Sequence, residues 1–206
     1  MKKNAYIYNK VKSMAVKAML FVSICPLATW LLASCGAENT ISTLYPCQFI
    51  FYTQYHPGSD IETALNGPGT YVMVSAKKVN AAWNIYTTLN DGKNKMNTIV
   101  LSTAKENYAN YSYLGANNGF ILGTSNFNGR VAWDRQCPNC ISQYTGTDYP
   151  LSWTGNRQFV NCAKCKRTYS LENGTVTEGG QGKEDKSLMQ YKVAYSGIGS
   201  ILTVGN

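Results

Sequence analysis

The chain has 206 residues, and its 19 basic and 11 acidic residues give a formal net charge of +8. Five of the lysines lie within residues 1–34, so the rest of the chain has 14 basic residues against 11 acidic ones, a net charge of +3. A charge this small excludes the strongly basic surface of a nucleic-acid-binding protein. The only histidine is His56, which we expect in a loop, so no histidine-based catalytic set is predicted. We therefore expect a protein that is not an enzyme.

Residues 1–34 have the features of a lipoprotein signal peptide. A basic start without acidic residues is followed by an apolar run over residues 18–33, as in secretory signals. The sequence LASC at 32–35 resembles a bacterial lipobox, which implies that Cys35 is lipidated and becomes the first residue. The alternatives are a plain signal peptide and an uncleaved membrane helix, although the run is short for a span of about 20 residues.

The lipobox resemblance also implies a location and a first partner. The protein is expected to be exported and to be anchored to a bacterial membrane through its N-terminal lipid. Gly36 stands where an Asp would argue for retention in the inner membrane, so we expect the outer membrane. Residues 35–46 are then the lipidated cysteine and a tether, and residues 47–206 form a single domain.

Short apolar and β-branched runs alternate with Gly, Asn and Asp turns through this domain, which favours an all-β fold, a small sandwich or barrel. A short helix with Asp60 as its N-cap is expected at 60–65. The Asn and Gly content of 104–118 favours a loop, with one helical turn as the alternative. The expected strands are 48–53, 70–76, 97–103, 119–124, 130–136, 157–161, 167–171, 188–195 and 200–204.

Four cysteines in two Cys-x-x-Cys pairs predict one metal site. Cys137 and Cys140 are separated by 21 residues from Cys162 and Cys165, close to the spacing of about 15–20 residues between zinc-binding pairs. Four thiolates suit Zn²⁺ and are also accepted by iron. Disulfides remain an alternative because an exported protein meets an oxidising compartment. The odd Cys47 lies in a strand-like run and is expected to be buried.

From about Gly119 to Val204 the sequence resembles a Rieske domain, the small all-β fold that carries a [2Fe–2S] cluster on two loops. The segments that carry the resemblance are RVAWDRQC (130–137), CAKCKRTYSLENG (162–174), EGGQGKEDKSLMQYKV (178–193) and GSILTV (199–204). The upstream half resembles the opening strands of exported Rieske-like lipoproteins of Bacteroides-type bacteria. The residues at the family spacing are Cys137, Cys162, Tyr169, Gly174, Leu188 and Tyr191.

Both cluster histidines of the Rieske family are replaced in this chain. The first falls at Asn139, with Cys140 one place beyond it, and the second falls at Cys165. A centre with two imidazoles on one iron therefore cannot form. Lys166 and Arg167 follow the second pair in place of a Gly and a Ser, and we expect them to offset the two net negative charges of a zinc centre with four thiolates.

Several interpretations of the four cysteines follow, with different functions. A structural zinc, the metal we expect, would have no open position for chemistry and would serve a binding or interaction role. A cysteine-ligated [2Fe–2S] cluster would make the protein an electron carrier, a component of an oxidoreductase. Disulfides would staple the same loops in a surface binding protein. Dithiol exchange is disfavoured because neither pair opens a helix that would lower a thiol pKa.

Aromatic residues and one charged pair complete the candidates. The segment YANYSYL at 108–114 has the most exposed-looking aromatic residues, and Tyr111 and Tyr113 predict a surface for a glycan or a protein partner. The alternative is that these aromatic residues fill the strands and core of a β protein. Asp134 and Arg135, just before Cys137, resemble a charge pair that orders the loop.

Overall fold

The computed structural model describes residues 41–141, 148–155 and 157–206. The predicted signal peptide, 1–34, and the lipidation site Cys35 lie outside the described residues. Within the described ranges no helix is both long and apolar enough to cross a membrane. The described part of the predicted tether begins beside β11, where Ile41 pairs with Gln190.

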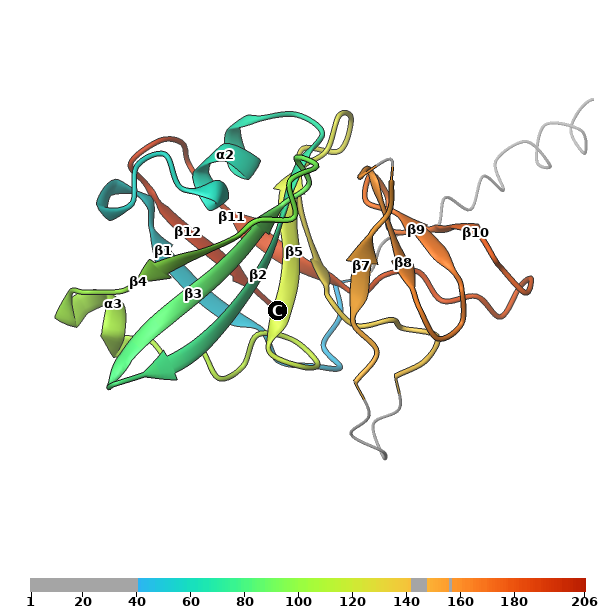
Figure 1. Ribbon diagram of the computed structural model, residues 1–206, viewed down its shortest axis with the longest axis horizontal. Helices are drawn as coiled ribbons and strands as arrows, with labels where there is room; N and C mark the ends of the chain where they lie inside the picture. The colour runs from blue at the N-terminus through green and yellow to red at the C-terminus, as the bar shows by residue number, and fades with distance from the viewer. Residues whose placement is uncertain (1–40, 142–147, 156) are drawn as a thin grey trace, which may run out of the picture. The chain divides into compact units, whose positions relative to one another are not determined.

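A large, curled antiparallel sheet makes up most of the domain (Figure 1). Neighbouring strands are joined by hairpins or by longer connections, and every pair is antiparallel. In spatial order its strands are β1 (Gln48–Tyr52), β12 (Ile201–Gly205), β11 (Gln190–Ala194), β6 (Arg130–Asp134), β5 (Gly119–Thr124), β2 (Thr70–Val79), β3 (Ala82–Leu89) and β4 (Met96–Val100).

The central strands of this sheet are buried on both faces. In β2, Val72 and Val74 point into one hydrophobic cluster, which we call the first core, whereas Tyr71 and Met73 point into another, the second core. Because successive side chains of a strand point to opposite faces, an unbroken apolar run such as YVMV fits a strand covered on both sides. Phe120 and Ile121 divide between the two cores in the same way.

A small antiparallel sheet lies beside the large one (Figure 1), and its buried side chains belong to the second core. Its strands are three or four residues long, too short to be stable without support from elsewhere. Trp133 of β6 connects the two sheets, because its buried indole N–H donates to the carbonyl of Leu171 at 3.0 Å. The strands of the small sheet, in spatial order, are β10 (Val176–Glu178), β9 (Thr168–Ser170), β8 (Phe159–Cys162) and β7 (Leu151–Trp153).

Within the described residues, three short helical segments accompany the sheets: η1 (Thr53–Tyr55), α2 (Asp60–Asn66) and α3 (Ala104–Tyr108). The N-cap of α2 is Ser59, whose hydroxyl accepts from the Glu62 N–H, so the prediction of Asp60 as the cap is wrong. The capping side chain therefore comes from the residue before Asp60, and its hydroxyl accepts from a helix N–H that has no partner within the helix.

In 104–118 the alternative of a short helical segment is confirmed at the start, where α3 forms in place of the favoured loop. Thr103 and Glu106 make a capping box, in which each side chain bonds the backbone N–H of the other residue. This reciprocal capping stabilises a helix only five residues long.

The prediction of an all-β fold is confirmed, and each of the nine expected strands overlaps an observed one. Cys47 is buried, as expected, with 4% of its surface exposed. Three strands were not predicted, namely β3, β7 and β10.

Candidate metal centre

Two tight turns carry the four predicted cysteine ligands. The first follows β6, where Cys137 accepts hydrogen bonds at its carbonyl from the N–H groups of Cys140 and Ile141, at 3.1 and 3.0 Å. The second follows β8, where the Lys166 N–H donates to the Cys162 carbonyl at 2.9 Å. Each turn folds a Cys-x-x-Cys segment back on itself, so both side chains of a pair leave the backbone on the same side.

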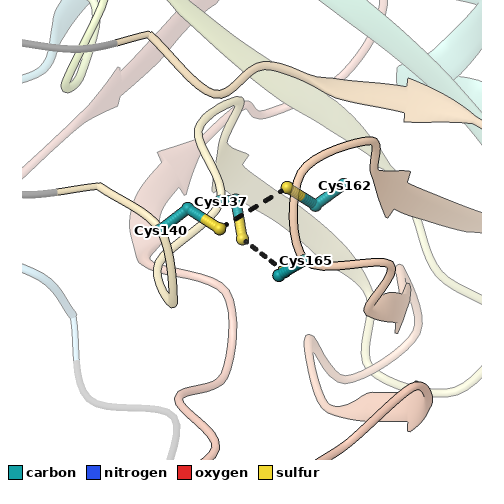
Figure 2. Close-up of side chains that lie close together, drawn as sticks. All are labelled: Cys137, Cys140, Cys162 and Cys165. Atoms are coloured by element: carbon teal, nitrogen blue, oxygen red, sulfur yellow. Dashed lines mark hydrogen bonds between the residues drawn. The ribbon is translucent and has the colours of Figure 1, made fainter.

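The four sulfur atoms converge on one point, as Figure 2 shows. All of them lie within 4.8 Å of one another. The Sγ atoms of Cys137 and Cys165 are 3.6 Å apart and those of Cys140 and Cys162 are 3.8 Å apart. Four thiolates around one tetrahedral ion, with bonds of about 2.3 Å, are separated by about 3.8 Å. The arrangement can therefore hold one metal ion, with each turn supplying two ligands.

The site is partly embedded in the second core. Cys137 and Cys162 are fully buried among its apolar side chains, whereas Cys140 and Cys165 are only partly buried at its edge. No pair of the four is joined as a disulfide, and the separations of 3.6 and 3.8 Å are far longer than a sulfur–sulfur bond of about 2.05 Å.

Polar side chains around the sulfurs hold the first turn in place. The phenol of Tyr169 lies 3.2 Å from the Cys137 sulfur. Asn139 donates to the same phenol oxygen at 2.9 Å and exchanges two hydrogen bonds with the backbone of Lys186. The Asn139 side chain thereby fastens a neighbouring loop to the first turn.

Arg167 supports the second turn. Its buried guanidinium pairs with Asp185 at 2.8 Å, and it also hydrogen-bonds the Cys165 sulfur. The second oxygen of Asp185 accepts from the backbone N–H groups of Gln181 and Gly182. The Gly-rich loop that contains Gln181 and Gly182 thus lies against the site. Arg167 has the placement expected of a cation that offsets thiolate charge, whereas Lys166 is exposed and does not.

The cysteines differ in how readily they lose a proton. Burial raises the pKa of Cys137 to about 11 and also raises the pKa of Cys140. Burial acts in the same direction on Cys165, but hydrogen bonds from the backbone and side chain of Arg167 lower the pKa of that thiol to about 6. Since metal ligands are thiolates, a bound cation is what would keep all four sulfurs deprotonated in so small a volume.

Two other sequence predictions need correction. Asp134 does not pair with Arg135, because its buried carboxylate accepts from the Tyr191 hydroxyl at 2.6 Å and from the N–H groups of Ala116 and Gln136. Desolvation by burial raises the pKa of this carboxyl. The carboxylate is oriented toward groups that satisfy its oxygens, and Arg135 points elsewhere.

The predicted aromatic surface is divided by burial. Tyr111 is 1% exposed and belongs to the first core, with its hydroxyl donating to the Ile50 carbonyl at 2.6 Å, so its assignment to a binding surface is wrong. Tyr108 and Tyr113 remain exposed, at 94% and 55%. His56 lies at the end of the short helix η1. Its Nε2 contacts Glu106 at 2.5 Å. It is far from the cysteines in sequence and bonded to none of them.

Sequence reasoning missed the supporting roles of Asn139 and Asp185. From the sequence, Asn139 has no assigned role beyond the absence of a histidine ligand in the Rieske resemblance, and Asp185 lies in a polar turn without any distinguishing pattern. Comparison of the chain with protein-family models, with curated proteins and with solved structures finds no match in any of the three.

Proposed function

We propose that Cys137, Cys140, Cys162 and Cys165 hold one zinc ion, which fixes the small sheet of an exported, lipid-anchored binding protein. The observation that carries the proposal is the mutual separation of the four sulfurs, none beyond 4.8 Å from another. Zinc with four thiolates has a closed, tetrahedral shell and leaves no position for water or substrate. Its contribution is to folding and not to turnover.

The same separations favour a single ion over the alternatives. A [2Fe–2S] cluster places its two pairs of thiolates on two different irons, which spreads the pairs further apart than a single ion does. Disulfides would join the sulfurs at about 2.05 Å. Two contacts between the turns, at 3.6 and 3.8 Å, are close enough for one metal ion to link both turns at once.

The lipid anchor and the Rieske-like ancestry belong to the same proposal. The lipobox-like LASC supports attachment at Cys35. The contact between Tyr169 and the Cys137 sulfur supports the resemblance, because both residues belong to the family pattern. On this proposal a redox fold has kept its two cysteine-bearing loops, lost its histidine ligands and become a scaffold for binding.

Metal analysis of freshly purified protein tests the centre. We expect colourless protein with about one zinc per chain, and cobalt substitution should give the visible absorption of a tetrahedral thiolate site. Brown protein that bleaches with dithionite would replace zinc by an iron–sulfur cluster. Absence of metal, with free thiols at the four positions only after reduction, would replace it by disulfides. Cys162→Ser should lose the zinc, and Cys47→Ala, which alters the cysteine outside the site, should keep it.

Membrane fractionation tests the anchor separately. The full chain should partition into detergent and incorporate labelled fatty acid, and Cys35→Ala should abolish both. A Cys35→Ala variant that still incorporates the label would overturn lipidation at this residue, whatever the metal analysis shows.

A further inference from the structure

A cleft of about 350 Å³ opens between β7 of the small sheet and the β2–β3–β4 part of the large sheet. It contains none of the four cysteines, so it is separate from the metal centre. Its wall combines polar groups and two aromatic side chains with the apolar side chains of Met73, Met96 and Leu151. The residues that matter for its chemistry are Ser75, Tyr86, Thr88, Asn94, Arg135 and Trp153.

The strand register brings Arg135 to this cleft. The Arg135 N–H donates to the Gly119 carbonyl at 3.2 Å, Gly119 is paired with Ser75, and Ser75 is paired with Tyr86. The arginine side chain passes over Gly119, where an added Cβ would lie 3.2 Å from its Cδ. Because glycine has no side chain, position 119 leaves the space through which Arg135 reaches Ser75 and Tyr86.

Two hydrogen-bond donors at the cleft have no partner. Arg135 Nε and Trp153 Nε1 are both shielded from solvent, and neither has a hydrogen bond within the described part of the chain. Asp148 acts on Arg135 only at longer range, and no ion pair to Arg135 is present among the described residues. A buried donor left unpaired costs about 1–3 kcal/mol, and a ligand oxygen that displaces the atoms covering these donors would recover part of that cost.

We propose that this cleft binds a sugar acid, a single pyranose ring that carries a carboxylate. Among the described residues that line the cleft, Arg135 is the only charged one, and a guanidinium matches a carboxylate with two parallel hydrogen bonds. Ser75, Thr88 and Asn94 offer donors and acceptors to ring hydroxyls. The volume is at the lower end of small-molecule sites, which span about 300–1,000 Å³, and so fits one ring.

The aromatic residues decide between a sugar acid and an apolar acid. Trp153 and Tyr86 offer flat faces for the C–H face of a pyranose, and the indole N–H offers a donor to a hydroxyl. A purely apolar ring would leave the amide of Asn94 and the hydroxyls of the cleft unpaired. This inference gives a ligand to the binding role proposed above, and the metal measurements succeed or fail independently of it.

Titration with D-glucuronate, monitored at the Trp153 indole N–H by NMR, tests the proposal on the intact protein. We expect a saturable shift of that resonance, with D-glucose, which lacks the carboxylate, and benzoate, which lacks the hydroxyls, each at least tenfold weaker. Arg135→Gln should abolish the shift. Lys192→Gln, which removes the same charge from the exposed face of β11, should bind as the wild type does.

Three results would overturn the proposal. The first is no shift with glucuronate up to about 10 mM, weaker than any useful affinity. The second is equal binding of glucose, which would remove the role of Arg135. The third is equal binding of benzoate, which would remove the role of the hydroxyls. If Arg135→Gln does not fold, Thr88→Val keeps the side-chain shape while deleting one hydroxyl, and it should weaken glucuronate binding several-fold.

Discussion

Each of the two sheets of this protein is stabilised by its own set of interactions. The large sheet has strands of five to ten residues around a first core in which aromatic rings pack edge to face, with Phe49 5.1 Å from Phe120 and 5.6 Å from Tyr111. The small sheet has strands of three or four residues, and its core includes all four candidate ligands. Apolar burial suffices for the first, whereas on the proposed function a metal cross-link between the two turns supports the second.

The largest expected effect is the loss of one ligand. Cys162→Ser should destabilise the small sheet by about 5 kcal/mol or more, because structural zinc supplies on the order of 10–16 kcal/mol of apparent binding free energy. Hydrogen exchange would show protection lost at Phe159–Cys162 and Thr168–Ser170 and kept at Gly119–Thr124.

The matched control for this change is Cys47→Ala, which alters a buried cysteine of the first core. It should leave both metal content and exchange in the small sheet unchanged. If Cys162→Ser exposed both sheets equally, the two regions would form one cooperative unit and the contrast between them would be wrong.

The reverse experiment removes apolar packing from the large sheet. Phe120 is fully buried and touches Phe49 edge to face, so Phe120→Ala should cost about 3–5 kcal/mol in the free energy of unfolding. Chemical denaturation measures the loss, and metal analysis of the folded variant should still find one zinc per chain. A variant that lost zinc in proportion to its stability would show that the metal turns depend on the first core.

The same contrast explains what the sequence predicts well and what it does not. Runs such as FIFY and GFILGT alternate or fill both faces of a strand, so the large sheet was found from its residues. β3 was missed because its hairpin turn, Asn80–Ala81, has no glycine, although both residues adopt the positive φ angles of a tight hairpin.

The small sheet was predicted less completely, for a physical reason. β7 and β10 have only three residues each, and so short a segment carries no periodic signal. The cysteine spacing predicted that the two turns meet, but the side chains that fasten them, Asn139 and Asp185, act through contacts that only the folded chain creates.

The junction between the sheets gives a smaller, sharper test. Gly174 has φ +73°, and an added Cβ would lie 2.9 Å from the ring of Trp133. Gly129 has φ +71° with nothing near its missing side chain, so Gly129→Ala measures the backbone strain alone. We expect Gly174→Ala to lower stability by about 2–3 kcal/mol, roughly 1–2 kcal/mol more than the control. Equal losses of stability in the two variants, measured by thermal unfolding, would mean that the Trp133 ring moves aside without an energetic cost. Trp133 would then not hold the small sheet in place.

The smallest predicted effect concerns pH and lies in the large-sheet region alone. Glu106 is buried. Although burial raises its pKa, hydrogen bonds from Thr103 and His56 bring the pKa below its ordinary value of 4.5. A carboxyl whose pKa is lower in the folded state adds stability at pH values above 4.5, and that stability is lost as the pH falls through the lower value.

Glu106→Gln should therefore cost about 1–2 kcal/mol at pH 7, and the difference from the wild type should shrink as the pH falls below 4.5. Urea unfolding at several pH values measures this, with the exposed Glu184→Gln as a control that should change little at any pH. Zinc content should not respond to Glu106→Gln, because His56 and Thr103 touch Glu106 and none of the cysteines does. A difference that stayed constant from pH 7 to 3 would show that the carboxylate charge is not what binds α3 to His56, and that shape alone holds this corner of the large sheet.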